Sequence, residues 1–380
     1  MSELSYLEKL LDGVEVKWLP LGHIAAIKTG QSVNKNMISK NPGVYPVINS
    51  GREPLGFINT WNTDNDPIGI TTRGAGVGSV IWQEGKYFRG NLNYSITIDK
   101  KSHINIRYMY HALLHMKNDI HELCTFDGIP ALNAGSLKKL LIPIPCPDNP
   151  EKSLAIQSEI VRILDKFTAL TAELTAELTA RKKQYNYYRD QLLSFKEGEV
   201  EWKTLGEVAT FRRGTAITQK QTTPGDIPVV ANGPTPTYFH SESNRQDETI
   251  VIARSGAYAG YVSFWNQPIF LTDAFSVHPN LKIVKPKFLY YVLQNKQEHI
   301  HAMKKGAGVP HVRVKEFESY DVPIPPLAEQ VRIVTILDKF DTLTNSITEG
   351  LPREIELRQK QYEYYRDMLF SFPKPDVVEA

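Results

Sequence analysis

Arginine, lysine, asparagine and glutamine recur in the glycine-flanked loops of this 380-residue chain. Side chains of these types make most of the contacts that proteins form with the base edges and phosphates of DNA. In the N-terminal half the candidate contact residues are Gln31, Asn34, Lys35, Arg52, Arg73, Arg89, Asn91 and Asn93. In the C-terminal half they are Arg213, Gln219, Lys220, Arg254, Lys304, Lys305, His311 and Arg313. For each of them, a solvated surface side chain is the alternative interpretation.

Residue patterns typical of catalysis are missing from the sequence. It has no Gly-x-x-x-x-Gly-Lys-Ser/Thr phosphate loop, and no Asn-Pro-Pro-aromatic motif of the kind that methylates adenine, because Pro325-Pro326 is followed by Leu327. His111 and His115 are four residues apart on one face of an expected helix and could bind a metal with a third ligand, but ordinary helix positions explain them as well. We therefore expect no catalytic residue and no metal site.

Composition fits a soluble protein of two or three domains with a net charge of +2. No apolar run approaches the roughly 18 residues of a membrane helix, and no leader signature is present, so we expect a cytoplasmic protein. The two cysteines, Cys124 and Cys146, suggest neither a disulfide framework nor a zinc site.

The chain repeats itself with a period of about 180 residues. Arg73-Gly74-Ala75 aligns with Arg254-Ser255-Gly256-Ala257, and proline-rich exits close both copies, at residues 142–145 and 322–325. The loops between these framework residues differ freely, as in one scaffold that carries two different binding surfaces. Because Arg73 and Arg254 occupy corresponding places, we expect them to contact phosphate or support the framework rather than select a base.

Each copy leads into a long helical segment. Apolar residues of the first, from Ile156 to Phe195, step by three and four, as on a helix that packs along another helix. Leu164-Asp165-Lys166-Phe167 reappears at 337–340, and RKKQYNYYRDQLLSF at 181–195 reappears as RQKQYEYYRDMLFSF at 358–372. Between them lies a direct repeat, Thr-Ala-Glu-Leu at 171–174 and 175–178. Repeat number is expected to set the distance between the two modules.

These patterns predict an α+β fold. Two similar recognition modules of short strands and helices are joined by two long antiparallel helices, a coiled coil with pseudo-two-fold symmetry. We expect a first recognition domain at 1–150, a central helix at 151–195, a second recognition domain at 196–325 and a C-terminal helix at 326–380. Gly350-Leu351-Pro352 is expected to break or kink the last helix.

The repeated LDKF segments, the TAEL repeats and the twin tyrosine-rich segments resemble the specificity subunit of a type I restriction-modification enzyme, of the type IC group. The resemblance covers the whole chain and implies a non-catalytic subunit. Each of its target recognition domains would read one half of a split double-stranded DNA sequence. It also implies that this subunit docks two methyltransferase subunits and, through the assembled complex, restriction subunits. S-adenosylmethionine, ATP and magnesium would bind those partners and not this chain.

The tyrosines of the twin segments offer more aromatic surface than one helix seam can bury. We expect partner-subunit docking at Tyr185, Tyr187, Tyr188, Tyr362, Tyr364 and Tyr365. The alternative function is a protein-interaction scaffold whose two modules bind something other than DNA.

Overall fold

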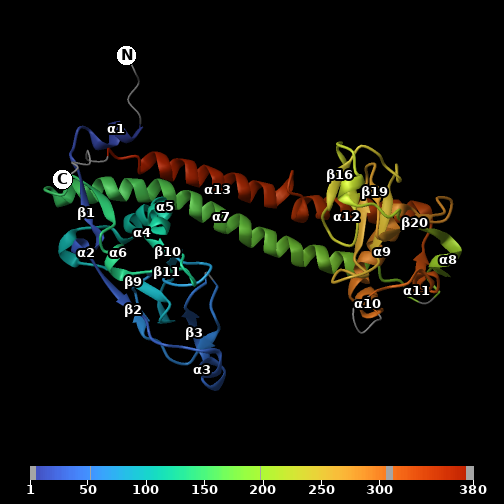
Figure 1. Cartoon of the computed structure of the whole chain (residues 1–380), viewed down its shortest axis with the longest axis horizontal. Coiled ribbons are helices and arrows are strands. Elements are labelled where there is room, and N and C mark those ends of the chain that lie inside the picture. The colour runs from blue at the N-terminus through green and yellow to red at the C-terminus, as the bar shows by residue number, and fades with distance from the viewer. Residues whose placement is uncertain (1–5, 52, 197, 305–310, 374–380) are drawn as a thin grey trace, which may run out of the picture. The chain divides into compact units, whose positions relative to one another are not determined.

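A computed structural model describes residues 6–51, 53–196, 198–304 and 311–373 of the chain (Figure 1). The chain folds as two compact units, unit 1 (Met1–Leu174 with Ile355–Ala380) and unit 2 (Thr175–Glu354). The predicted α+β class, with two similar modules joined by long helices, is confirmed.

Unit 1 contains short strands and short helices, followed by the first half of a long helix. Its strands are β1 (Val16–Pro20), β2 (Ala25–Thr29), β3 (Pro42–Ile48), β4 (Phe57–Ile58), β5 (Thr63–Asp64), β6 (Ile68–Thr71), β7 (Val80–Trp82), β8 (Lys86–Arg89), β9 (Asn93–Ile98), β10 (Cys124–Thr125), β11 (Ala131–Leu132) and β12 (Leu141–Pro145). Its short helices are α1 (Tyr6–Leu11), α2 (Leu21–Ile24), α3 (Lys35–Lys40), η1 (Lys100–Ser102), α4 (Ile106–His115), α5 (Lys117–Glu122) and α6 (Ala134–Leu137).

Unit 2 follows a similar order with fewer described elements. Its strands are β13 (Glu201–Thr204), β14 (Ala209–Arg213), β15 (Ile227–Val230), β16 (Tyr238–His240), β17 (Thr249–Ala253), β18 (Val262–Trp265), β19 (Phe270–Leu271), β20 (Ala274–Pro279) and β21 (Asp321–Ile324). Its helices are α8 (Leu205–Val208), η2 (Gln219–Gln221), α9 (Pro286–Asn295), α10 (Gln297–Ala302), α11 (Val314–Glu318) and α12 (Leu327–Asn345). The long helices α7 (Pro150–Leu192) and α13 (Gly350–Leu369) contribute residues to both units.

The main sheets of the two units share their strand order, while β5 and the pair β10-β11 are described in unit 1 alone. The order β2-β9-β6-β7 in unit 1 matches β14-β20-β17-β18 in unit 2, and β4-β3-β8 matches β16-β15-β19. In both second sheets the middle pairing is parallel, β3 with β8 and β15 with β19. A two-stranded antiparallel pair, β1-β12 or β13-β21, joins the start of each module to its proline-rich exit. The internal repeat seen in the sequence is therefore a repeat of structure.

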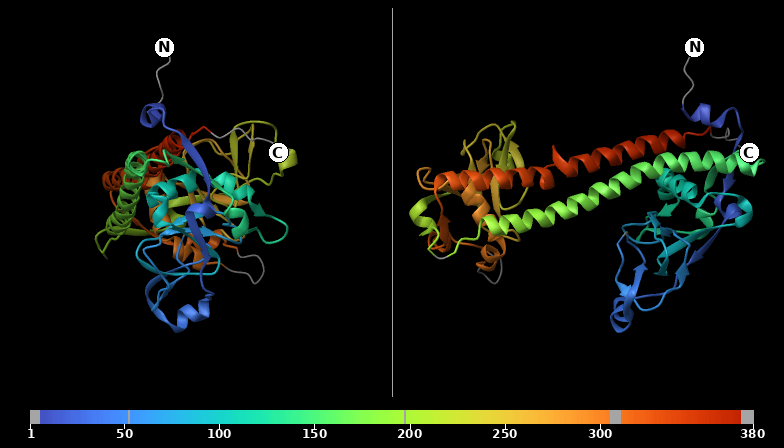
Figure 2. Two further views of the ribbon diagram at one scale, coloured as in Figure 1. Left: turned by 90° about the vertical axis from the view of Figure 1, so that its left-hand side faces the viewer. Right: turned by 180° about the vertical axis from the view of Figure 1, so that it is seen from behind.

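The long helices complete the core of each unit. In unit 1, Ile160 and Leu164 of α7 are fully buried in one cluster with Tyr108 of α4 and Leu369 of α13. In unit 2, Tyr185 of α7 joins a cluster with Leu337 of α12. Burial of each such leucine contributes about 1.5–3 kcal/mol to the free energy of folding. A recognition module therefore shares its core with the helices that carry it, and Figure 2 shows α4 lying along the first half of α7.

Two polar side chains of each long helix fix the adjoining module. Gln157 Oε1 accepts a hydrogen bond from the amide of Asn105 at 2.8 Å, and Gln330 Oε1 accepts one from Lys285 at 2.8 Å. About two turns further along each helix lies the aspartate of the LDKF segment. It bonds side chains of the helix that follows those amides: Arg107 and His111 bond Asp165, and Lys287 and Tyr291 bond Asp338. The repeated LDKF segment thus joins module to helix in both units.

Between α12 and α13 the chain turns at Gly350. Its φ is +76°, and a Cβ at this position would lie 2.3 Å from the carbonyl oxygen of Thr342. Both the left-handed conformation and the close approach require glycine. The C-terminal helical segment consequently consists of two helices, with α12 ending at Asn345 and α13 starting at Gly350.

Proline and asparagine mark the start of the central helix. Asn149 Oδ1 accepts from the amide of Lys152 at 3.1 Å, and Pro150 occupies the first position of α7, where no amide hydrogen is needed.

Among the described residues, none of the helices is long and apolar enough to cross a membrane.

Candidate nucleic-acid interface

Four of the predicted contact residues of unit 2 converge on one cavity of about 510 Å³. These are Arg213, Arg254, His311 and Arg313, and they come from three separate parts of the sequence. The rest of the lining is Ser255, Phe275, Val312, Val314 and Lys315. With four permanently charged side chains, the cavity is suited to an anionic ligand.

Strand ends position these side chains. Arg213 is the last residue of β14 and pairs with Phe275 on β20. Ser255 forms an antiparallel bridge with His311, and the amide of Val312 donates to the carbonyl of Arg254 at 3.0 Å. The segment that carries His311 and Arg313 is thereby held against the end of β17.

A carboxylate limits the charge at one side of this cavity. Arg254 forms an ion pair of 2.8 Å with Asp273, and Asp273 also accepts hydrogen bonds from Asn232 and Ser255. Arg254 is therefore partly neutralised and held in place. Arg213 and Arg313 are exposed and lie nearer to solvent, which favours them as contacts to a ligand.

The equivalent place in unit 1 has the same backbone and a different lining. Arg73 forms an antiparallel bridge with Ala131, just as Ser255 does with His311. The predicted correspondence of Arg73 with Arg254 is therefore wrong by one residue, because the carbonyl that accepts from the following strand belongs to Thr72 in unit 1 and to Arg254 in unit 2. Following this register, the counterparts of Arg313 and Lys315 are Asn133 and Gly135, and the counterpart of Arg213 on β2 is Thr29. The framework is shared, but the cationic surface belongs to unit 2.

The other candidates are spread over separate loops and short helices and do not line this cavity. Gln31, Lys35, Arg73 and Asn91 of unit 1 are exposed, and Asn34 is exposed while its side chain caps α3 by accepting from the amide of Met37. Gln219 and Lys220 lie in η2, and Lys304 Nζ donates to the carbonyl of Ala257 at 3.1 Å. Arg52 and Lys305 fall outside the described residues.

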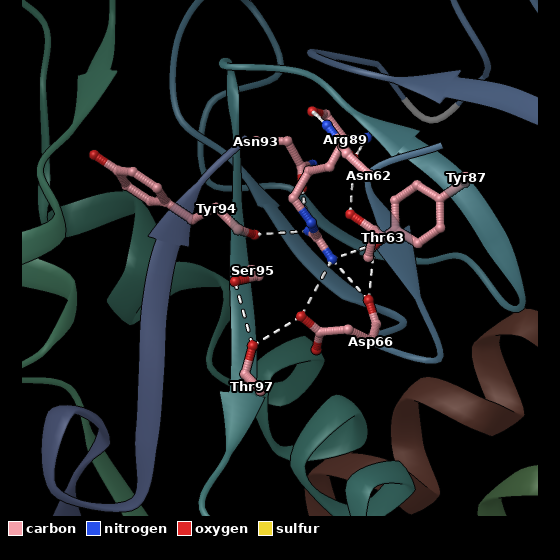
Figure 3. Close-up of polar contacts among 9 residues, drawn as sticks. All are labelled: Asn62, Thr63, Asp66, Tyr87, Arg89, Asn93, Tyr94, Ser95 and Thr97. Carbon is pink, nitrogen blue, oxygen red and sulfur yellow. Dashed lines mark hydrogen bonds and ion pairs between the residues drawn. The ribbon is translucent and has the colours of Figure 1, made fainter. Parts of the chain in front are cut away.

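Two candidates are placed inside unit 1, so their assignment as direct DNA contacts needs correction. Arg89 and Asn93 are 3% and 0% exposed. Arg89 Nη1 donates to Asn93 Oδ1 at 2.5 Å and to the carbonyl of Tyr94 at 3.1 Å, and Nη2 donates to the carbonyl of Asp66 at 2.7 Å (Figure 3). The Tyr87 hydroxyl also bonds Arg89. These side chains hold the two sheets together. The sequence gives no sign of this, because Arg89 and Asn93 flank a short Gly- and Asn-containing turn of the kind that is usually exposed.

Burial shifts the pKa values of this network. Desolvation raises the pKa of Tyr87 to about 12 and lowers the pKa of the Arg89 guanidinium. Beside it lies a cavity of about 360 Å³ lined by Lys28, Thr29, Gly30, Gln31, Asn62, Thr63, Asp64, Asp66, Arg89, Ser95 and Thr97. Unlike the cavity of unit 2, it carries two carboxylates.

The six tyrosines predicted to dock partners separate into two kinds. Tyr185 and Tyr362 are buried at 6% and 4% exposure, so they belong to the cores and not to a free surface. Tyr187 is 61% and Tyr364 66% exposed, and each packs edge-on against the tyrosine that follows it. Tyr188 then stacks on Phe340, and Tyr365 stacks on Phe167. Each unit therefore has the same cluster of three aromatic rings, called here an aromatic step: Tyr187, Tyr188 and Phe340 in unit 2, and Tyr364, Tyr365 and Phe167 in unit 1.

The paired histidines of unit 1 hold structure together. His111 bonds Asp165 and Tyr362, and His115 Nδ1 lies 2.9 Å from Asp367 Oδ1. Within the parts of the chain that the structure describes, no group of three potential ligands could hold a metal ion. Cys124 is buried, Cys146 is partly exposed, and both are free thiols.

Sequence reasoning missed several polar residues of these sites. Lys315 lines the cavity of unit 2. A second cationic group in the same unit consists of Arg212 on β14, His278 on β20 and Arg245. Alignment of the repeats places Arg212 opposite Lys28, two residues before Gly214 and Gly30. This correspondence could have pointed to Arg212 from the sequence, whereas Arg245 lies in a loop whose sequence has no recognisable counterpart in the first repeat.

Comparison with known families agrees with the repeated architecture. The family described as "Type I restriction modification DNA specificity domain" matches twice, at residues 13–181 and 197–357. The chain belongs to this family. It is 43% identical to the Escherichia coli type I restriction enzyme EcoR124I/EcoR124II specificity subunit, over 100% of both chains, and 36% identical to the E. coli EcoprrI specificity subunit, over 92% of this chain and 93% of that one. The predicted type IC specificity subunit is confirmed.

Solved structures support the fold. The type I restriction-modification S subunit from M. genitalium superposes with a TM-score of 0.68 at 21% identity, covering 98% of this chain and 99% of that one. As a specificity subunit, the present chain is the non-catalytic, DNA-recognising component of a type I restriction-modification system.

Proposed function

We propose that the two recognition domains, at residues 1–150 and 196–325, each read one half of an asymmetric, two-part DNA sequence with an unread gap. The main support for this proposal is that the two domains have the same backbone framework, whereas the side chains at equivalent places differ. The bridges Arg73 to Ala131 and Ser255 to His311 are equivalent, yet the residues around them differ in charge. A common scaffold with two different surfaces favours two different half-sites.

The long helices set the gap. Helix α7 contains both Thr-Ala-Glu-Leu repeats, and each unit of four residues adds about 6 Å to a helix. The repeats have exposed alanines and glutamates and make little contact with either core. Their number can therefore change without loss of packing, which suits a spacer.

The exposed aromatic steps seat two methyltransferase subunits. One step consists of Tyr187 and Tyr188 with Phe340, and the other of Tyr364 and Tyr365 with Phe167. Because the steps are equivalent, one kind of partner surface fits both. The partners supply S-adenosylmethionine, and the restriction subunits that join the complex use ATP and magnesium.

Co-expression with the methyltransferase subunit, followed by genome-wide mapping of methylated adenines, tests the proposal. The expected product is a two-part motif with different halves and a constant gap. A continuous motif would contradict the two-domain reading. Absence of a DNA gel shift by the complex would favour a scaffold that binds something other than DNA.

A further inference from the structure

Each unit has an arginine between its two sheets, Arg89 in unit 1 and Arg245 in unit 2. The two arginines do not occupy equivalent positions in the repeat. In unit 1, Asn62 and Arg89 exchange hydrogen bonds through their side-chain amide and backbone, and in unit 2 Asn244 and Leu271 do the same. Leu271 therefore occupies the place of Arg89. The guanidinium of unit 2 comes instead from Arg245, the residue after Asn244.

Unit 1 neutralises its arginine internally. Asp66 Oδ2 lies 3.9 Å from Arg89 Nη2 and accepts a hydrogen bond from the Thr97 hydroxyl at 2.8 Å (Figure 3). Thr97 in turn lies 3.4 Å from Ser95. With a carboxylate at its centre, this part of unit 1 has no need of an external anion.

Unit 2 gathers cations at the same strands without such a carboxylate. Arg245 Nε donates to the hydroxyl of Ser276 at 2.8 Å, and the same hydroxyl lies 2.8 Å from His278 Nε2. Arg245 Nη1 and Nη2 each donate to a backbone carbonyl, of Asn244 at 2.7 Å and of Arg213 at 2.9 Å, so the guanidinium is held in place by the protein. Arg212 is directly opposite Ser276 on the neighbouring strand, so its side chain shares their face of the sheet. In the described part of unit 2, no carboxylate forms an ion pair or hydrogen bond with Arg212, Arg245 or His278.

The geometry also separates this group from the cavity described above. Arg212 and Arg213 are consecutive on β14, so their side chains point to opposite faces of the sheet. Arg213 faces the cavity with Arg254 and Arg313. Arg212 lies on the other face of the sheet, which it shares with Ser276 and His278.

We propose that Arg212, Arg245 and His278 form a clamp for one phosphate group of the DNA backbone, present in unit 2 and absent from unit 1. This rests on the proposed function, since it assigns one contact within the second half-site. The Ser276 hydroxyl orients Arg245 and His278, and Arg212 supplies an exposed guanidinium. Guanidinium groups donate hydrogen bonds without accepting any, and the N–H of an imidazole ring is a further donor, which matches phosphate oxygens.

Mutual repulsion supports this assignment. Desolvation, followed by the charges of Arg212 and Arg245, lowers the pKa of His278, and desolvation followed by Arg212 lowers the pKa of Arg245. A bound phosphate would relieve that repulsion. The contact would then add affinity for any sequence, since phosphates carry no base identity.

The test measures DNA affinity of the complex with its methyltransferase subunits between 50 and 300 mM salt, values typical of such titrations. Arg212→Ala removes an exposed guanidinium that makes no side-chain bond in the structure, so the fold should persist. We expect the slope of log affinity against log salt to become shallower by about 1, with the methylated motif unchanged. His278→Gln should weaken binding in the same direction. The matched control is Lys28→Ala, which alters the equivalent position on β2 and should leave the slope unchanged.

An unchanged slope in Arg212→Ala, measured on a wild-type complex that does bind its two-part target, would overturn the clamp and leave the proposed function standing. If the wild-type complex binds no two-part target, the proposed function itself fails. A second measurement compares inorganic phosphate with the target duplex by the shifts that each causes in the His278 ring resonances. If phosphate shifts them as strongly as the duplex does, and Arg212→Ala keeps the wild-type slope, the group is a site for a free anion and the assignment to DNA is overturned.

Discussion

His111 Nε2 of α4 lies 2.8 Å from the Asp165 carboxylate of α7. The other ring nitrogen, Nδ1, lies 2.9 Å from the Tyr362 hydroxyl of α13. One fully buried imidazole therefore joins the first recognition module to both helices that support it. In unit 2 the corresponding residue is a tyrosine, Tyr291, which donates to Asp338 at 2.5 Å. Both units therefore have a hydrogen bond from the module to this aspartate, but only histidine can take up a proton in mildly acidic solution.

Acid should destabilise unit 1 through His111. Burial lowers the pKa of His111 to about 4, below the value of about 6.5 in an unfolded chain. Between these values the unfolded chain binds the proton and the folded chain does not, so the free energy of unfolding falls as pH falls below about 6.5. The loss should reach about 2–3 kcal/mol near pH 4. Urea titrations at pH 7.5, 6 and 5 measure it.

His111→Gln is the matched variant for that measurement, because glutamine hydrogen-bonds without titrating in this range. Its free energy of unfolding at pH 7.5 should be lower than that of the wild type, but it should fall less between pH 7.5 and 5. Equal pH dependence of the two proteins would show that His111 does not cause the effect.

Removing the Asp165 carboxylate should be more costly than removing an exposed one. Asp165→Ala leaves Arg107 and His111 without their common partner, and the loss of such a charged hydrogen-bond partner costs about 1–3 kcal/mol. Glu177→Gln breaks an exposed pair with Arg181 and should cost only about 0.3–0.5 kcal/mol. Thermal unfolding of both variants gives the comparison, and equal losses would argue against a joining role for Asp165.

Sequence periodicity and repetition were sufficient for the architecture, since repeated framework residues such as Gly30 and Gly214 mark equivalent turns. They were insufficient for the polar contacts. Arg89 and Arg313 look alike in sequence, both being loop-flanked arginines, yet one is buried between sheets and the other is exposed. That difference depends on strand pairings between distant segments. The LDKF aspartates were visible as a repeat, but their partners on α4 and α9 follow only from the packing.

Gly350→Ala should destabilise the turn between α12 and α13. Alanine at φ +76° is strained, and its Cβ would collide with the Thr342 carbonyl. A cost of about 1–3 kcal/mol is expected from the backbone strain. Gly233→Ala is the control, because a Cβ there meets nothing within 4 Å and φ is not left-handed. If the two variants unfold at the same temperature, the turn does not require glycine.

Arginines of the unit 2 cavity should contribute to DNA affinity, either as exposed cations or by neutralising a nearby carboxylate. Arg313→Ala removes an exposed cation and should weaken binding and make the salt slope shallower by about 1. Arg254→Ala also releases Asp273 from its ion pair and should weaken binding further. Arg73→Ala tests the exposed arginine of unit 1, which corresponds in register to Ser255 and follows the counterpart of Arg254 by one residue. Unchanged affinity and salt slope in all three variants would exclude these arginines as phosphate contacts.

Exposed tyrosines should matter for assembly and little for stability. Tyr187→Ala and Tyr364→Ala remove side chains that are 61% and 66% exposed, so thermal unfolding of the isolated chain should change little. Each should weaken binding of one methyltransferase subunit, and the double variant should weaken both, as measured by native mass spectrometry. Wild-type stoichiometry in the double variant would exclude the aromatic steps as docking sites.

The length of the Thr-Ala-Glu-Leu segment should control the gap of the target. Inserting a third unit after Leu178 lengthens α7 by about 6 Å without adding to either core. The methylated motif should keep both halves and gain a longer gap. An unchanged gap would contradict the spacer role of these repeats.

Exchange of one recognition domain tests the central claim most directly. Residues 196–325 would be replaced by the aligned segment of the EcoR124I/EcoR124II specificity subunit, and methylated adenines would be mapped for both the parent and the hybrid. If each domain reads its own half-site, one half of the motif changes and the other half persists. A motif that changes in both halves, or in neither, would contradict the account.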